Sequence, residues 1–247
     1  MTEETLVRTT NEGCDYIIIE HIDSKKVKIK FLDEHCFCKI TPTTSLKTGS
    51  IKNPYFKKKY NVGYIGDGVY KSTEKGISTR IYNCWDFMIE RCYNEKRNVK
   101  NKNYTNVVVC EEWHNFQNYA EWYEKSYIEG FELDKDLLQQ DVENKIYSPE
   151  TCIFIDCTVN LFLASGKGIR NKNPNDVYKI KNSSKYTCRC SNPFTRKIEF
   201  IGNFDCPEEA HTAWLTRKLE LAKLLAAKQN DPRVAEALLD RYENYNC

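Results

Sequence analysis

Residues 177–204, VYKIKNSSKYTCRCSNPFTRKIEFIGNF, decide the fold predicted for the C-terminal part of this chain. Apolar and polar side chains alternate in three short runs, VYKIKN, KYTCRCS and RKIEFIGNF, and period-two alternation is typical of strands with one buried face. A helix is predicted to begin at Cys206-Pro207, because proline suits the first helical position and Glu208 and Glu209 suit the first turn. Three strands followed by a helix predict a small α+β unit.

The alternation also predicts which side chains share a face of this sheet. Tyr186, Cys188 and Cys190 are expected on one face and Lys185, Thr187 and Arg189 on the other. In the neighbouring runs we expect an apolar set to oppose a polar one: Tyr178, Ile180, Ile198 and Phe200 against Lys179, Lys181, Lys197 and Glu199. The helix containing Trp214 would cover the apolar face and leave a cationic face open.

An open cationic face of this kind fits double-stranded DNA, since a ribbon of strands enters the major groove and Arg or Lys contacts guanine edges and phosphates. The alternative is that these side chains only keep the sheet soluble. The residues predicted to bind DNA are Lys179, Lys181, Lys185, Arg189, Arg196 and Lys197.

The same segment resembles the Apetala-2-type DNA-binding domain of plant transcription factors and of phage and mobile-element endonucleases. The matching residues are VYKIKNSSKYTCRC, IGNF and CPEEAHTAW. The resemblance implies that the sheet, and not the helix, contacts DNA. Cys206 is a departure, because a hydroxyl residue usually caps this helix.

Residues 133–160, LDKDLLQQDVENKIYSPETCIFIDCTVN, predict a strand, a loop, a second strand and a short helix. This block resembles the HNH, or β-β-α-metal, nuclease module. The resemblance implies that Asp134 and Asn160 bind Mg²⁺ or another divalent cation, that Asn144 is the loop asparagine, and that the reaction is phosphodiester hydrolysis.

The general base of that module is missing, because Lys135 stands where the histidine is expected and an ordinary lysine is a poor base at neutral pH. Three substitutes stay open: a desolvated Lys135, Asp136, or His114 from the preceding helical segment. The alternative is structural, with Asp134 and Asp136 as surface acids and Asn160 holding the short helix.

The N-terminal part has two different patterns. Val27, Ile29 and Phe31 alternate with lysines within residues 15–41, which predicts antiparallel strands, and a glycine-rich stretch with the lysine run 57–59 follows. From Thr79 the period becomes helical, with one apolar stripe (Ile81, Trp85, Met88, Ile89, Cys92) and then a predicted aromatic core (Trp113, Phe116, Tyr119, Tyr123). The α+β chain is predicted to have three domains, 1–76, 77–165 and 166–247, with a linker at 166–176.

Composition restricts the class of protein. The 247 residues carry 37 Lys+Arg, 35 Asp+Glu and 40% apolar side chains, which predicts a folded chain. No apolar run reaches the roughly 20 residues needed to cross a bilayer, and the N-terminus lacks a signal-peptide pattern, so a cytoplasmic location without a membrane partner is expected. The twelve cysteines are expected as reduced thiols, and their spacing does not favour a structural zinc site.

The order of these segments is similar to that of bacteriophage proteins with an HNH-like centre and an Apetala-2-like end. This resemblance includes YNVGYIGDGVY, DFMIERCYN and CEEWHNFQNYAEW. It implies a phage-type DNA-binding protein and metal-dependent homing endonuclease, located in the cytoplasm of a host cell if viral. The alternative is a catalytically inactive DNA-binding or anti-defence protein that has lost the general base and has a host protein as partner.

Overall fold

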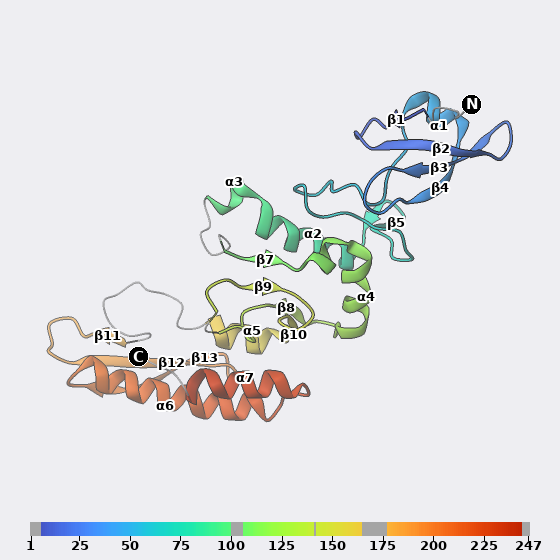
Figure 1. Cartoon of the computed structure of the whole chain (residues 1–247). Helices are drawn as coiled ribbons and strands as arrows, with labels where there is room; N and C mark the ends of the chain where they lie inside the picture. The colour runs from blue at the N-terminus through green and yellow to red at the C-terminus, as the bar shows by residue number, and fades with distance from the viewer. Residues whose placement is uncertain (1–5, 100–105, 141, 165–176, 244–247) are drawn as a thin grey trace. The chain divides into compact units, whose positions relative to one another are not determined.

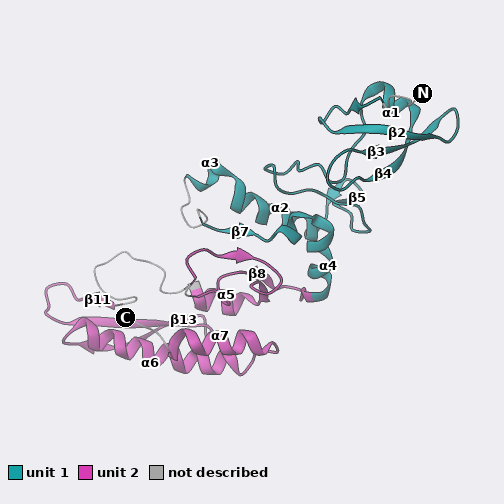
Figure 2. Ribbon diagram, viewed as in Figure 1, with its two compact units in different colours: residues 1–125 teal, residues 126–247 magenta. Residues whose placement is uncertain are grey.

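The computed structural model describes residues 6–99, 106–140, 142–164 and 177–243 (Figure 1). The chain forms two compact units, unit 1 (Met1–Lys125) and unit 2 (Ser126–Cys247), which Figure 2 colours separately. Helices and antiparallel sheets occur together, so the predicted α+β class is confirmed. In the described residues, no helix is both long enough and apolar enough to cross a bilayer.

Unit 1 begins with a four-stranded antiparallel sheet in the order β1-β2-β3-β4. Its strands are β1 (Arg8–Thr9), β2 (Asp15–His21), β3 (Lys26–Phe31) and β4 (Cys38–Pro42), and α1 (Thr43–Thr48) follows. Val27, Ile29 and Phe31 have no exposed surface, because alternation along β3 turns all three toward the same face. The predicted N-terminal sheet is therefore confirmed.

The second half of unit 1 is mainly helical. Its elements are β5 (Thr73–Glu74), β6 (Ile77–Ser78), α2 (Arg80–Tyr93), α3 (Glu95–Asn98), β7 (Val108–Val109), the 3₁₀ helix η2 (Glu111–His114) and α4 (Phe116–Ser126). The predicted aromatic core is confirmed: Trp113, Phe116, Tyr119 and Tyr123 are buried, as is the α2 stripe except for the half-buried Ile81. The Trp85 indole N–H donates to the carbonyl of Trp113 at 2.7 Å, which joins α2 to η2.

The glycine-rich loop before α2 is held closely by α4. The Gln117 amide accepts from the N–H of Tyr70 at 2.9 Å and donates to its carbonyl at 3.0 Å. A Cβ atom on Gly68 would lie 2.3 Å from the Gln117 side-chain oxygen, and Gly66 has a φ of 73°. Glycine is required at both positions, because the backbone passes within contact distance of Gln117 at Gly68 and of Asn115 at Gly66.

Unit 2 starts with the predicted strand-loop-strand-helix order, which is confirmed. Strand β8 (Glu132–Asp134) pairs antiparallel with β10 (Ile153–Ile155), β9 (Ile146–Tyr147) lies between them in the sequence, and α5 (Cys157–Ala164) follows. We call this segment, residues 132–164, the β-β-α centre.

The C-terminal sheet has the order β11-β12-β13, with β11 (Val177–Lys179), β12 (Tyr186–Asn192) and β13 (Lys197–Phe204). Helices α6 (Pro207–Ala226) and α7 (Pro232–Glu243) begin at the predicted prolines. Cys206 caps α6, because its sulfur accepts from the N–H of Glu209 at 3.4 Å.

One hydrophobic core joins the β-β-α centre to the C-terminal sheet and helices. Ile155 and Phe162 belong to the same buried cluster as Cys188, Trp214 and Leu238. The predicted boundary at 165/166 and the linker at 166–176 lie outside the described residues, and the division into three domains stays a prediction. Because both sides of that boundary contribute to one core, they stabilise each other.

Candidate nucleic-acid interface and the β-β-α centre

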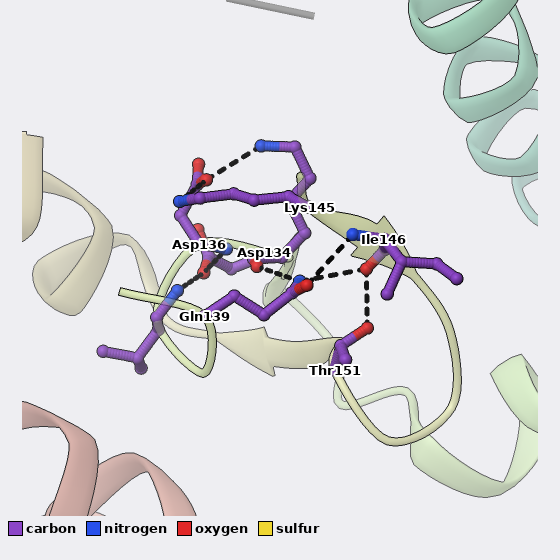
Figure 3. A network of polar contacts seen from close by, with 8 residues as sticks. Asp134, Asp136, Gln139, Lys145, Ile146 and Thr151 are labelled. Atoms are coloured by element: carbon purple, nitrogen blue, oxygen red, sulfur yellow. Dashed lines mark hydrogen bonds and ion pairs between the residues drawn. The ribbon is translucent and has the colours of Figure 1, made fainter. Parts of the chain in front are cut away.

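Asp134 ends strand β8, and its carboxylate holds the turn that follows. Its Oδ1 atom accepts hydrogen bonds from the backbone N–H of Asp136 at 2.8 Å and of Leu137 at 2.7 Å (Figure 3). Burial raises the pKa of Asp134 above its ordinary value, although these two hydrogen bonds act in the opposite direction. Asp134 therefore has a structural role, whatever it does toward a cation.

Lys135 and Lys145 share one carboxylate oxygen. The Nζ atom of Lys135, a side chain only 8% exposed, donates to Asp136 Oδ1 at 2.9 Å, and Lys145 donates to the same atom at 2.6 Å (Figure 3). Burial raises the pKa of Asp136, but the bonds from the two lysines lower it to about 2. Asp136 is therefore ionised at neutral pH, and Lys135 acts toward it as a donor and not as a base.

A buried glutamine ties the loop of the β-β-α centre to strand β9. The Gln139 amide nitrogen donates to the carbonyls of Lys135 at 2.7 Å and Ile146 at 2.9 Å, and its oxygen accepts from the N–H of Ile146 at 2.9 Å (Figure 3). The Thr151 hydroxyl donates to the same Ile146 carbonyl at 2.6 Å. Sequence reasoning missed Gln139; the available signal was a polar residue directly after Leu137 and Leu138.

The strand and the helix of the β-β-α centre are joined by a pair that the sequence did not single out. The Asn160 amide nitrogen on α5 donates to Glu132 Oε2 on β8 at 2.7 Å. Glu132 lies two residues before Asp134 and shares its side of the strand. Asn144, by contrast, is exposed in the loop before β9.

The structure shows no cluster of three or more His, Cys, Asp or Glu side chains that could hold a metal ion, within the residues that it describes. The predicted Mg²⁺ site between Asp134 and Asn160 stays a prediction. Because Asn160 contacts the carboxylate of Glu132, Glu132 is a third candidate ligand for that site.

His114 lies in unit 1 and has partners there. Its Nε2 atom lies 3.1 Å from the carbonyl oxygen of Val109 and 3.3 Å from the Tyr93 hydroxyl. Burial lowers the pKa of His114 below its ordinary value, so the ring is neutral at neutral pH. Its predicted role as a substitute base stays a prediction.

The predicted faces of the C-terminal sheet are confirmed for β12 only. Cys188 and Cys190 are buried against the helix side, and Arg189 is exposed. On β13, however, Ile198 is 69% exposed and Phe200 is 63% exposed, so their predicted burial is wrong.

A β-bulge explains the error on β13. Cys188 pairs with Gly202, but Arg189 pairs with Phe200, so Ile201 is an extra residue. One extra residue reverses the alternation of every side chain before it, which turns Glu199 toward the helix side and Phe200 outward. On β11, Val177 pairs with the buried Cys188, so Tyr178 faces outward, also against the prediction.

The outer face of the sheet is therefore mixed in chemistry and not uniformly cationic. We call it the open face; its residues are Tyr178, Thr187, Arg189, Ser191, Ile198, Phe200 and Asn203. Arg189 is the predicted DNA-binding cation on this face. It lies beside Phe200 in the pairing register, and Tyr178 lies one row away.

The other predicted DNA-binding cations lie around the ends of β12. Lys181 and Lys185 belong to the turn before β12, and Arg196 belongs to the turn after it. Lys179 ends β11 opposite Tyr186 and Lys197 begins β13 opposite Asn192, so neither is on the open face. At about 3.3 Å per residue, the two ends of β12 are roughly 20 Å apart.

A partly buried polar network holds the turn that presents Arg196. The Asn192 side chain accepts from the N–H of Phe194 at 2.8 Å and donates to Glu199 at 2.7 Å. Arg217 on α6 donates to Glu199 at 2.9 Å, and this bond lowers the pKa of Glu199. The reversed alternation thus places Glu199 where it can neutralise Arg217.

Comparison of the chain with protein-family models, curated proteins and solved structures gives no match. The resemblances to the HNH module and to the Apetala-2-type domain therefore stay predictions, and the functional argument depends on the geometry above.

The shared carboxylate predicts an acid-sensitive stability of unit 2. Because the pKa of Asp136 is about 2 in the folded chain and lies near 3.9 in an unfolded one, the unfolded chain binds more protons in acid. The stabilisation is present above about pH 4 and is lost as the pH falls toward 2. Allowing for the partial exposure of this carboxylate, we expect about 1–2 kcal/mol.

Urea unfolding of Asp136→Asn and of the unmodified chain, followed by circular dichroism from pH 6 to pH 3, measures this effect. The difference between the two free energies of unfolding should shrink below about pH 4. Asp240→Asn, at an exposed aspartate of α7, is the control. A difference that stays constant with pH would contradict the assignment.

Proposed function

We propose that this chain is a DNA-binding protein that holds a duplex against the open face of its C-terminal sheet. The observation that carries the proposal is the exposed Arg189 at the centre of a face that also exposes Tyr178, Ile198 and Phe200. Helices α6 and α7 belong to the core on the other side, so the open face is available to a partner.

The chemistry of the open face suits the major groove. An arginine can donate two hydrogen bonds to a guanine edge, and apolar side chains can contact thymine methyl groups. Cations at both ends of β12, roughly 20 Å apart, suit the phosphates on either side of a groove about 12 Å wide. Phosphate contacts position the protein, and Arg189 supplies the contact that reads bases.

For the β-β-α centre we propose phosphate binding without hydrolysis. Lys135 and Lys145 bring two positive charges to the turn after β8, where the carboxylates of Asp136 and Asp134 lie, and the Lys145 side chain is 22% exposed and can also donate to a phosphate. A general base needs a free lone pair, and Lys135 uses its ammonium group as a donor to Asp136. This supports the catalytically inactive alternative, in which binding is retained.

The second candidate is a metal-dependent endonuclease, and the Glu132–Asn160 pair favours it. The Asn160 amide nitrogen on helix α5 donates to the Glu132 carboxylate on strand β8 at 2.7 Å, so both side chains reach the same place, and each also has an oxygen atom of the kind that hard divalent cations prefer. In this candidate Glu132, with Asp134, completes the set of ligands, and the base is supplied by a side chain other than Lys135.

An electrophoretic mobility-shift assay and a plasmid-nicking assay separate these functions. We expect a duplex shift that weakens steeply between about 50 and 200 mM salt, without nicking in Mg²⁺ or Mn²⁺. Nicking that disappears in Glu132→Gln and in Asn160→Ala would establish the endonuclease instead. Absence of a shift at low salt, together with capture of a host protein, would defeat both DNA-binding functions.

A further inference from the structure

Unit 1 contains a cavity of about 680 Å³ that none of the functions above uses. It lies between β4, residues 52–65 and the start of α2. Four aromatic side chains line it, together with four lysines: Phe37, Phe56, Tyr64, Tyr82, Lys39, Lys52, Lys58 and Lys59. This volume is within the usual range of sites for small organic ligands.

The four lysines differ in their partners. Lys58 pairs with Glu12 at 2.9 Å, and Lys59 pairs with Asp86 at 2.7 Å. Lys39 donates to the carbonyl of Lys52 at 3.2 Å. In the described part of the chain, neither Lys39 nor Lys52 forms an ion pair, so their positive charge is available to an anionic ligand.

The walls of the cavity are held in place by contacts within unit 1. The N–H of Gly66 donates to the carbonyl of Pro54 at 2.9 Å, and the Asn53 side chain bonds to both Asp33 and the N–H of Tyr55. Gly63 packs against Trp85 so closely that a Cβ atom there would lie 2.9 Å from the indole ring. The cavity is therefore preformed, and little binding free energy is lost in ordering its walls.

We propose that this cavity binds one nucleotide, with the base among the aromatic rings and the phosphate near Lys39 and Lys52. Aromatic side chains beside cations are the usual combination for an unstacked base and its phosphate. Asp67 and Glu12 also line the cavity and can accept hydrogen bonds from exocyclic amino groups of a base. A nucleotide can stack its base on the aromatic rings and place its phosphate near the lysines at the same time.

The ligand could be a free mononucleotide or one nucleotide of a single strand, and both have this chemistry. The cavity lies in unit 1 and the open face lies in unit 2, so a variant can lose binding at one site and keep binding at the other. Arg189→Glu should lose duplex binding and keep nucleotide binding.

Isothermal titration calorimetry of the full chain with dAMP and dTMP tests the proposal, with adenosine and inorganic phosphate as partial ligands. We expect saturable binding of the mononucleotides and weaker binding of either part alone. The double variant Lys39→Gln, Lys52→Gln should bind about tenfold more weakly or worse, because it loses charge-assisted contacts to phosphate.

The matched control is Lys47→Gln with Lys71→Gln, which removes two exposed lysines of unit 1 that do not line the cavity. Circular dichroism should show that both double variants are folded. No saturable binding by the unmodified chain, or equal weakening by both double variants, would overturn the proposal. A short oligothymidylate is then added to the Arg189→Glu variant with dTMP bound. If it displaces dTMP, the natural ligand is a nucleotide of a single strand; if it does not, the ligand is a free mononucleotide.

Discussion

Replacement of Arg189 by glutamate is expected to weaken duplex binding by about 100-fold or more. A good arginine–guanine contact contributes about 1–3 kcal/mol of discrimination, and reversing the charge adds repulsion from the phosphates. The Arg189 side chain is exposed on the open face. Phe200 lies directly opposite it on β13, and Tyr178 lies one row away on β11. Fluorescence anisotropy of a labelled duplex, at one fixed salt concentration, gives the two dissociation constants.

The matched control for Arg189→Glu is Lys223→Glu, which also reverses one charge in unit 2. Lys223 is exposed on α6, outside the open face, and its Nζ atom lies 3.8 Å from Glu243, so its effect on duplex binding should be limited to the general change in net charge. Arg189→Gln should fall between the unmodified chain and Arg189→Glu. Equal losses in Lys223→Glu and Arg189→Glu would mean that the open face has no special role.

Lys218→Ala should destabilise unit 2 by about 3–5 kcal/mol. Lys218 has no exposed surface, and its Nζ atom donates to the carbonyl of Phe162 at 3.1 Å. This carbonyl belongs to the last turn of α5, where carbonyls lack partners within the helix and a positive charge is favoured. The alanine variant loses that bond and leaves a cavity among three helices.

Aromatic rings compensate for burying this lysine. Nζ lies 4.0 Å from the ring centroid of Phe162, 5.7 Å from that of Trp214 and 5.8 Å from that of Tyr242, which belong to α5, α6 and α7 respectively. The face of each ring attracts a cation, so part of the desolvation cost is offset. Lys218 therefore connects the β-β-α centre to both C-terminal helices.

Hydrogen exchange measured by mass spectrometry is the suitable readout for Lys218→Ala, because three of the four tryptophans lie in unit 1 and fluorescence would mostly report that unit. Exchange should accelerate in residues 153–163 and 207–226 and stay unchanged in unit 1. Lys218→Met keeps the apolar stem and should lose less, about 1–2 kcal/mol. If Lys218→Ala behaves like Lys223→Ala, the assigned role is wrong.

Much of the fold could be predicted from local pattern. Alternation in β3 and helical spacing in α2 each identified a buried face, because each depends on residues that are near in sequence. The faces of β11 and β13 could not be predicted, because they depend on the register with β12. The bulge at Ile201 reverses the pattern that alternation predicts, and its available signal was Gly202, because a glycine inside a strand pattern often marks a bulge.

The candidate site was predicted only in part. The order of strand, loop and helix was right, but Glu132 and Gln139 were missed because their partners, Asn160 and Ile146, are set by tertiary contacts. The dual pairing of Asp136 with Lys135 and Lys145 could not be predicted either, since Lys145 is nine residues away across a loop.

The bulge at Ile201 also means that the chemistry of the outer sheet surface is encoded by the register of β13 as much as by its residues. Regular pairing that kept Ile201 would set it opposite Arg189, shift the residues before it by one position, hide Ile198 and Phe200 and bring Glu199 to the outside without any substitution. A lineage of such chains could therefore exchange an apolar recognition surface for an acidic one by a one-residue shift of register, a change that no comparison of aligned residue identities would reveal.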